Sequence, residues 1–110
     1  MEGKEKEQVT TMMVLFNLKT ATNKQAYEDW ARGRDIPAVR SLPSVSAFNV
    51  HRTSDFSNPS EQTPYSYVEV IEITEMESFK NDIAQPAMQE VAKEFQRYAD
   101  RPIFAVLEPI

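Results

Sequence analysis

Apolar residues are grouped along the chain in two different periodicities, and four of these groups have the pattern of a β-strand. Residues 11–18, TMMVLFNL, are almost continuously apolar, as in a short strand that is buried on both faces. Residues 45–52, 65–73 and 103–107 are rich in β-branched and aromatic side chains. The sequence therefore predicts a sheet of four short strands.

The segment between the first two predicted strands has the apolar spacing of a helix, and we predict one over residues 24–33. Thr22 and Asn23 precede this segment, and both residue types cap helix N-termini. Asp35 is predicted to cap a second, short helical turn, which Pro43 ends. The apolar face of the first segment consists of Ala26, Tyr27, Trp30 and Ala31.

A second helical region lies between the third and fourth predicted strands. Thr74 and Glu77 have the spacing of a capping box, which predicts the start of this region. Pro86 is expected to break or restart the helix. An apolar stripe continues at helical spacing through residues 87–99, so the helix is predicted to run almost to the last strand.

The order of these elements is strand, helix, strand, strand, helix, strand. That order is typical of the ferredoxin-like βαββαβ fold, an α+β fold in which two helices cover one face of a four-stranded antiparallel sheet. The first and last strands are apolar on both sides, so the second face of the sheet also needs a cover. A second copy of the chain would supply it, which predicts a homodimer of the dimeric α/β-barrel type.

We expect a single domain at residues 10–110, preceded by a charged, mobile tail at residues 1–9. Residues 53–64 contain turn-forming residues and two prolines, and they are predicted to form a loop that is long for a hairpin. The chain begins without the apolar core of a signal peptide, and no apolar stretch approaches the ~18 residues of a membrane span. The expected location is therefore cytoplasmic.

Composition excludes several kinds of chemistry. The chain of 110 residues has no cysteine, one histidine and two glycines. Disulfides, thiolate nucleophiles, cysteine-ligated zinc and glycine-rich phosphate loops are therefore excluded, and we expect neither a metal nor another cofactor. The net charge of −5 argues against nucleic acid and against an anionic membrane surface as partners.

Side chains that can transfer protons lie on the second and third predicted strands. If residues 48–50 pair with residues 68–70, the alternation of side chains gathers an amide, an imidazole, a phenol and a carboxylate on one face of the sheet. These groups belong to Asn49, His51, Tyr67 and Glu69. The length of the 53–64 loop leaves this register open, so the arrangement is an assumption.

Three of these residues are candidates for catalysis. Histidine is a residue type that commonly transfers protons, which makes His51 a candidate, and Glu69 would act as a base if burial raised its pKa. Tyr67 would donate a hydrogen bond to a developing oxyanion. A structural interpretation is open for each of them, with His51 exposed at a strand end, Glu69 paired with an arginine across the dimer, and Tyr67 in an interface.

The first predicted helix supplies further candidates. Tyr27 and Trp30 lie on its apolar face, where they are either core residues or the aromatic wall of a pocket between helix and sheet. Asp35 and Arg40 follow in a short segment, where a helix cap and a salt bridge would explain them.

Four stretches of the sequence have a more specific pattern. They are FNLK at 16–19, YEDWARGRDIPAVRSLPSV at 27–45, PYSYVEVIEI at 64–73 and PAMQEVAKEFQRYADRP at 86–102. Together they resemble the RedY-like (HapK) family, a family of small dimeric α/β-barrel proteins named from prodigiosin gene clusters. The resemblance covers about residues 13–108. The residues that match the family pattern are Asn17, Trp30, Asp35, Arg40, Tyr67 and Glu69, whereas His51 is not part of it.

This resemblance implies a role in bacterial specialised metabolism of pyrrole- or indole-derived molecules. Relatives in the same barrel superfamily include cofactor-free cyclases and cofactor-free quinol monooxygenases. The resemblance and the candidate residues together predict a cofactor-independent enzyme that cyclises or rearranges a small aromatic intermediate. A substrate that carries its own reactivity needs mainly positioning and proton transfer from such an enzyme.

In this prediction each candidate residue has a role. Glu69 or His51 is the base, and Tyr67 and Asn17 stabilise polar groups of the substrate. The remaining substrate-binding candidates are Tyr27, Trp30, Asp35 and Arg40. Two alternatives are open, a cofactor-free monooxygenase of the same superfamily and a carrier that shields an unstable intermediate without turnover.

Overall fold

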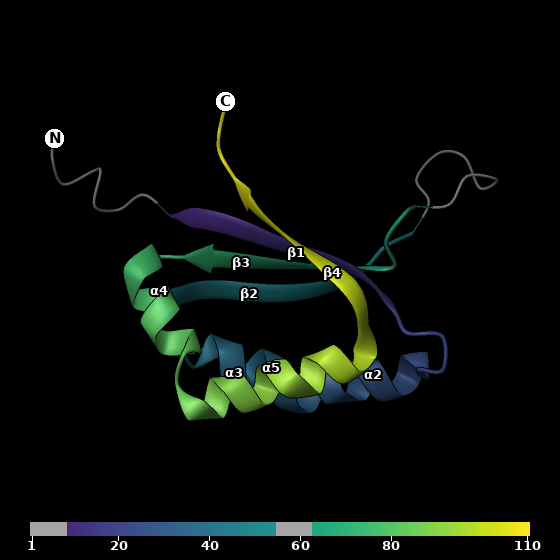
Figure 1. Cartoon of the computed structure of the whole chain (residues 1–110). Coiled ribbons are helices and arrows are strands. Elements are labelled where there is room, and N and C mark those ends of the chain that lie inside the picture. The colour runs from purple at the N-terminus through teal and green to yellow at the C-terminus, as the bar shows by residue number, and fades with distance from the viewer. Residues whose placement is uncertain (1–8, 55–62) are drawn as a thin grey trace, which may run out of the picture.

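The computed structural model describes residues 9–54 and 63–110, and its strands form one antiparallel sheet (Figure 1). The strands are β1 (Thr10–Leu18), β2 (Val45–Arg52), β3 (Tyr67–Ile73) and β4 (Ala99–Leu107). They lie in the order β2-β3-β1-β4, with the first and third strands at the centre. This order confirms the predicted ferredoxin-like α+β fold.

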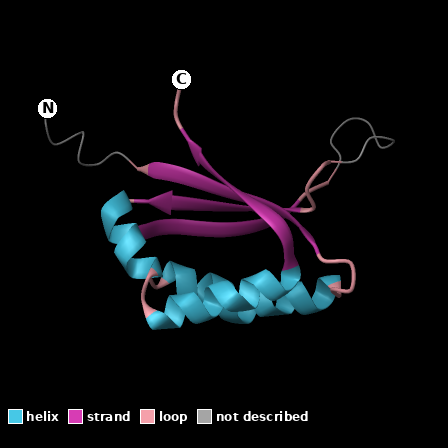
Figure 2. Cartoon of the chain, viewed as in Figure 1, coloured by secondary structure: helices cyan, strands magenta, loops and turns pink. Residues whose placement is uncertain are grey.

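The helices cover one face of this sheet (Figure 2). The first helical run consists of α2 (Lys24–Trp30), a π-helical segment η1 (Ala31–Asp35) and α3 (Ile36–Arg40). The second run consists of α4 (Met76–Ile83) and α5 (Pro86–Tyr98), so the predicted restart at Pro86 is confirmed. The last strand follows α5 directly, and it therefore begins at Ala99 rather than at residue 103.

Side chains cap the two helical runs at their N-termini. The predicted cap Asn23 is confirmed, because its Oδ1 accepts a hydrogen bond from the Ala26 N–H at 3.1 Å. The predicted capping box of Thr74 and Glu77 is wrong, since the cap of α4 is Glu75. The Thr74 hydroxyl instead donates to the Ser44 carbonyl at 3.2 Å, a contact that ties the start of this region to the residue just before β2.

Asp35 lies inside the first helical run, so the prediction that it caps a second helix is wrong. Its φ of −68° and ψ of −54° are helical, and its side chain makes no capping hydrogen bond. The Ile36 N–H donates to the Ala31 carbonyl five residues back, which is the hydrogen bond of a π-helix. The wider turn changes the direction in which the following side chains point, and Asp35 is buried as a result.

The pairing of β2 with β3 differs by one residue from the assumed register. Val50 lies opposite Glu69, and His51 lies opposite Val68. Directly opposed residues share a face of the sheet, so Glu69 and Val50 face the helices whereas His51 and Asn49 face the other side. The assumption that His51 and Asn49 share a face with Glu69 is therefore wrong.

The core fills the space between the helices and the sheet. Its largest fully buried side chains are Tyr27, Phe16, Phe48, Ile73 and Val14. The Phe16 ring contacts Tyr27 edge-on and stacks on Tyr67, each with a ring-centroid distance of 5.6 Å. Within β1 only Val14 and Phe16 are fully buried, so in the single chain this strand is covered on one face.

Large apolar side chains of β4 are exposed on both faces of the sheet. Phe104 is 61% exposed on the helix-facing side, where it lies opposite Val14. Ile103 is 46% exposed on the other side, opposite Leu15. Exposed large apolar side chains along one strand are typical of a contact with another molecule.

No helix within residues 9–54 and 63–110 is long and apolar enough to cross a membrane. The predicted tail at residues 1–9 lies, apart from Val9, outside the described residues, and so does most of the predicted loop at residues 53–64. The division into a tail and a domain at residues 10–110, and the cytoplasmic location, therefore stay predictions.

The π-helical segment allows a test of the fold. Gly33 lies in this segment, and a Cβ atom built on it meets nothing within 4 Å. We expect Gly33→Ala to raise the free energy of unfolding by about 0.5–1 kcal/mol, because alanine loses less conformational entropy than glycine on folding into a helix. Urea denaturation measures this change, and a destabilised variant would show that the segment has a different conformation.

Candidate active site

A cavity of about 320 Å³ lies between the helices and the sheet. Its wall is mostly apolar and includes Met12, Ile71, Phe79, Met88 and Phe95. These residues come from β1, β3, α4 and α5, so the wall of the cavity is built from elements that are far apart in the sequence. A concave apolar space with a few polar groups is the usual form of a small-molecule site.

Two acidic side chains, Asp35 and Glu69, belong to the wall of this cavity. Glu69 is on β3, where alternation turns it toward the helices together with Tyr67 and Ile71. Asp35 is the last residue of η1 and approaches from the helical side. Asp35 is 5% exposed and Glu69 is 6% exposed. The structure thus brings together two carboxyl groups that are separated by a long stretch of sequence.

Burial sets the protonation state of this pair. Loss of solvent raises the pKa of Asp35 to about 6, and a hydrogen bond with Glu69 opposes that rise. Burial also raises the pKa of Glu69 well above its usual value, and the negative charge of Asp35 and the hydrogen bond between them raise it further. Since two adjacent buried carboxylates repel each other, the pair holds one proton near neutral pH.

Two buried oxygens close to this pair are available to a ligand. The Tyr27 hydroxyl and Glu69 Oε2 have no hydrogen-bond partner among the described residues. Buried polar atoms are almost always paired, by water or a ligand where the protein supplies no partner. These two oxygens are therefore candidate contact points for water or for a polar group of a substrate.

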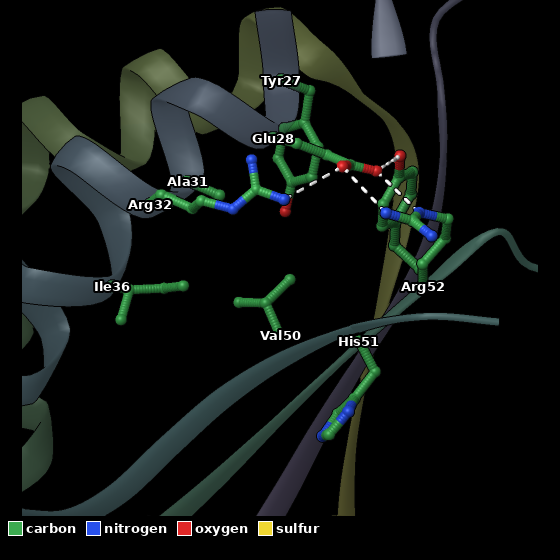
Figure 3. A pocket seen from close by; sticks show the side chains of 9 residues that line it. Tyr27, Glu28, Ala31, Arg32, Ile36, Val50, His51 and Arg52 are labelled. Atoms are coloured by element: carbon green, nitrogen blue, oxygen red, sulfur yellow. Dashed lines mark hydrogen bonds and ion pairs between the residues drawn. The ribbon is translucent and has the colours of Figure 1, made fainter. Parts of the chain in front are cut away.

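A second, smaller hollow of about 110 Å³ lies beside the cavity; we call it the arginine pocket (Figure 3). Its wall includes Arg32 and Arg52, and both contact the carboxylate of Glu28. The Arg52 guanidinium donates to Glu28 through two bonds of 2.9 and 3.1 Å. Hydrogen bonds from Arg52 and from Tyr67 lower the pKa of Glu28 to about 2, so this carboxylate is ionised at neutral pH.

Tyr67 is part of this ionic cluster. Its hydroxyl donates to Glu28 Oε2 at 2.7 Å, and its ring stacks on Phe16. Burial and this hydrogen bond raise the pKa of Tyr67 to about 12. Tyr67 lines the arginine pocket rather than the larger cavity, so its hydroxyl and the Glu69 carboxyl face different spaces.

Asn17 and Arg40 make hydrogen bonds to backbone groups, and neither residue is in the wall of the cavity. Asn17 Oδ1 accepts a hydrogen bond from the Ser66 N–H at 2.9 Å, which fixes the chain just before β3. The Arg40 Nε donates to the Phe48 carbonyl at 2.9 Å and links α3 to β2. The structure therefore brings neither residue to the acid pair, and these contacts give each of them a structural role.

Trp30 lies in the contact between the two helical runs. Its indole Nε1–H donates to Glu94 Oε1 at 2.8 Å, and its ring packs on Phe95 and Tyr98. Arg34 binds the same carboxylate with bonds of 2.9 and 3.1 Å. Glu94 on α5 thus holds the π-helical segment in place, one residue before Asp35.

His51 points away from the other labelled side chains of the arginine pocket (Figure 3). It is exposed on the face of the sheet opposite the helices. The imidazole and the Glu69 carboxyl are therefore on different faces, and the structure does not bring them together.

Sequence reasoning missed Glu28, Arg52 and Glu94. Glu28 and Arg52 are on α2 and β2, and their ion pair depends on how these elements pack. Glu94 lies on the polar side of α5, where the pattern of apolar residues gives no sign of a specific partner. Only the side-chain contacts in the structure reveal these roles.

The arrangement in the cavity is suited to acid–base chemistry. One carboxyl that holds a proton and a neighbouring carboxylate can give and take protons without a cofactor. Within residues 9–54 and 63–110, no group of three His, Asp or Glu side chains is arranged as metal ligands.

The fold and this cavity define a class, that of ferredoxin-like α+β proteins with a pocket between the helices and the sheet. More specifically, the chain belongs to the family of the REDY-like protein HapK, whose model matches residues 10–110. The recognition of this family from the sequence is confirmed. A comparison with curated protein sequences gives no match.

Solved structures support the same assignment. The crystal structure of HapK from Hahella chejuensis is 30% identical in sequence, with a TM-score of 0.71 and 92% of each chain covered. SnoaB, a cofactor-independent oxygenase from Streptomyces nogalater, is 16% identical, with a TM-score of 0.70 and 92% of each chain covered. A dimeric ferredoxin-like protein from Thermobifida fusca is 10% identical, with a TM-score of 0.71 and coverages of 92% and 91%. The last two similarities show the fold alone.

The acid pair predicts an unusual dependence of stability on pH. Because the pKa of Asp35 is raised from 3.8 to about 6, the folded state holds a proton that the unfolded chain releases. The stability from this group is complete below pH ~4 and is lost as the pH rises through about 6. We expect Asp35→Asn to raise the free energy of unfolding at pH 8 by on the order of 2 kcal/mol.

Denaturation of both proteins at pH 4 and pH 8 measures this difference, with the largest gain expected at pH 8. The control is Asp29→Asn, which removes a carboxylate that is 66% exposed on α2, within the same helical run. An Asp35→Asn variant that is less stable than the parent protein at both pH values would show that Asp35 is ionised and stabilising.

Proposed function

We propose that the protein is a cofactor-independent enzyme of bacterial specialised metabolism that cyclises or rearranges a small aromatic, pyrrole- or indole-derived intermediate. The observation that carries this proposal is the Asp35–Glu69 pair in the wall of an apolar cavity. Membership of the HapK family supports the metabolic context.

In this proposal the pair works as one unit near neutral pH. The Asp35 carboxylate takes a proton from the substrate, and the Glu69 carboxyl donates a hydrogen bond or its proton to a developing oxyanion. Burial supports these roles, because it raises the pKa of Asp35 to about 6 and that of Glu69 still further. The proposal refines the prediction that Glu69 or His51 is the base, and it gives the charged role to Asp35.

The cavity supports this class of substrate. Its volume of about 320 Å³ suits a compact aromatic molecule, and its apolar wall favours one with little charge. Phe79, Phe95 and Phe104 line the cavity and supply aromatic surface for stacking. This is the role that was predicted for Tyr27 and Trp30, and neither is among the described lining residues of the cavity.

The proposal includes a homodimer. β4 exposes apolar side chains on both faces, and the similar protein from Thermobifida fusca is described as dimeric. A partner that packs against the sheet would cover Ile103 and Leu107, which are 46% and 43% exposed. Burial of such a surface favours association by about 25 cal/mol for each Å² of apolar area.

Activity of variants tests the acid pair. We expect Glu69→Gln and Asp35→Asn each to lower turnover by roughly 10²–10⁴-fold, the usual contribution of a positioned acid or base. Both changes keep the shape of the side chain, so the folded structure should be retained. The substrate for this assay is the pyrrole- or indole-derived intermediate that accumulates when the gene is deleted in its host.

Two control variants accompany this assay. Glu77→Gln makes the same chemical change at a side chain of α4 that is 76% exposed, and His51→Asn removes the imidazole on the opposite face of the sheet. Both should retain turnover. Loss of activity in His51→Asn, with normal activity in Glu69→Gln and Asp35→Asn, would contradict the assignment of the acid pair.

The same assay separates the alternatives. Consumption of oxygen in step with product would favour a cofactor-free monooxygenase; SnoaB is described as a cofactor-independent oxygenase. Product formation that stops at one equivalent per protein chain would favour a carrier. The proposal requires many turnovers without oxygen uptake.

The dimer is tested by sedimentation at micromolar concentration. We expect about twice the chain mass of 12.6 kDa, because β4 leaves apolar side chains uncovered. Ile103→Lys places a charge on that surface and should shift the protein toward the monomer, whereas Glu77→Lys on α4 should not. A folded protein that sediments as a monomer would contradict this part of the proposal.

A further inference from the structure

The acid pair lies between two separate spaces. The cavity is lined by Asp35 and Glu69 themselves. The arginine pocket is lined by Ile36, the residue after Asp35, and by Val50, which lies opposite Glu69 in the sheet. The two carboxyl groups therefore line the cavity, and neighbours of the residues that carry them line the arginine pocket.

Tyr27 lies at the boundary of these spaces. Its side chain extends from α2 toward the sheet and toward Val50 (Figure 3). The residue is fully buried, and its hydroxyl has no hydrogen-bond partner among the described residues. The ring is held by Phe16, Tyr67 and Tyr98, with ring-centroid distances of 5.6, 4.9 and 5.7 Å, so the position of the hydroxyl is fixed.

We propose that the Tyr27 hydroxyl carries protons between solvent and the Asp35–Glu69 pair, together with water in the arginine pocket and a water that bridges the hydroxyl to Glu69 Oε2, since neither oxygen has a partner among the described residues. This inference rests on the proposed function, because it supplies the protons that the pair exchanges with a substrate. It gives Tyr27 a role as a proton-relay residue, in place of the predicted role in stacking.

The chemistry of a phenol suits this role. A tyrosine hydroxyl passes a proton by accepting one on its oxygen while releasing its own, so the group is neutral before and after each transfer. Burial raises the pKa of Tyr27 above its ordinary range, and the nearby Glu69, Asp35, Tyr67 and Glu28 raise it further. The phenol therefore stays protonated near neutral pH.

The arginine pocket is suited to hold the water that the relay needs. Its volume of about 110 Å³ exceeds the space that one water molecule requires. Arg32, Arg52 and the Glu28 carboxylate provide polar partners for water in its wall. Arg32 and Arg52 have side chains that are 62% and 55% exposed, so this pocket is in contact with solvent.

A path for protons through the arginine pocket is useful because a bound substrate would block the path through the cavity. An aromatic molecule in the cavity would exclude water from the apolar wall and from the side of the acid pair that faces it. Proton exchange with solvent during turnover would then depend on the opposite side, where Tyr27 and the arginine pocket lie.

The experiment measures proton exchange of the acid pair without a substrate. A rapid pH jump through pH 6 is followed by infrared spectroscopy of the carboxylic acid C=O band, which Glu69→Gln and Asp35→Asn assign. Tyr27→Phe should leave the midpoint of this titration nearly unchanged and slow the exchange by about tenfold, since one hydrogen-bonded step is lost. Its melting temperature should not fall, because the lost hydroxyl is buried and has no partner among the described residues.

Two further variants complete the test. Tyr98→Phe removes a hydroxyl from the same aromatic cluster and should exchange at the parent rate. Val50→Leu narrows the arginine pocket, keeps the Tyr27 hydroxyl and should also slow exchange. Exchange at the parent rate in both Tyr27→Phe and Val50→Leu would overturn the relay and leave the proposed function intact. Absence of a carboxylic acid band at pH 6 in the parent protein would instead overturn the acid pair, and with it the proposed function.

Discussion

The burial of two carboxyl groups next to each other is the constraint on which the site depends. Asp35 and Glu69 are 5% and 6% exposed, and a pair of ionised carboxylates in such a place would be strongly unfavourable. The pair therefore keeps a proton at a pH where exposed carboxyl groups have lost theirs. A proton held in this way is available for acid–base chemistry. Holding it lowers the free energy of unfolding of the protein at neutral pH.

The rest of the fold holds these two groups in place. Regular alternation along β3 turns Glu69 toward the helices, and the wide turn of η1 brings Asp35 to meet it. Glu94 on α5 fixes that turn from outside through Arg34, whose guanidinium makes two bonds to its carboxylate. The ionic cluster around Glu28 supports the other side of the first helical run, where Tyr27 lines the arginine pocket.

Much of the fold could be predicted from the sequence, because each strand and helix has its own apolar periodicity. The face of the sheet on which the Glu69 side chain lies could also be predicted, because side chains alternate along a strand and Tyr67 and Ile71 on the same face are core residues. The register between β2 and β3 could not be predicted, since residues 53–64 are too long to fix it, and a shift by one residue moved His51 to the opposite face. The π-helical turn at Asp35 has no sequence signal, so a residue that reads as a helix cap became half of the candidate site.

The central claim is that Glu69 is neutral and Asp35 is charged near neutral pH. Carbon-13 NMR of the side-chain carboxyl groups, titrated with pH in the parent protein and assigned with Glu69→Gln and Asp35→Asn, tests it most directly. We predict that the Asp35 resonance titrates near pH 6 and that Glu69 is still protonated above that pH. Titration of both groups near the ordinary values of 3.8 and 4.5 would contradict the account, because the cavity would then contain two ordinary carboxylates.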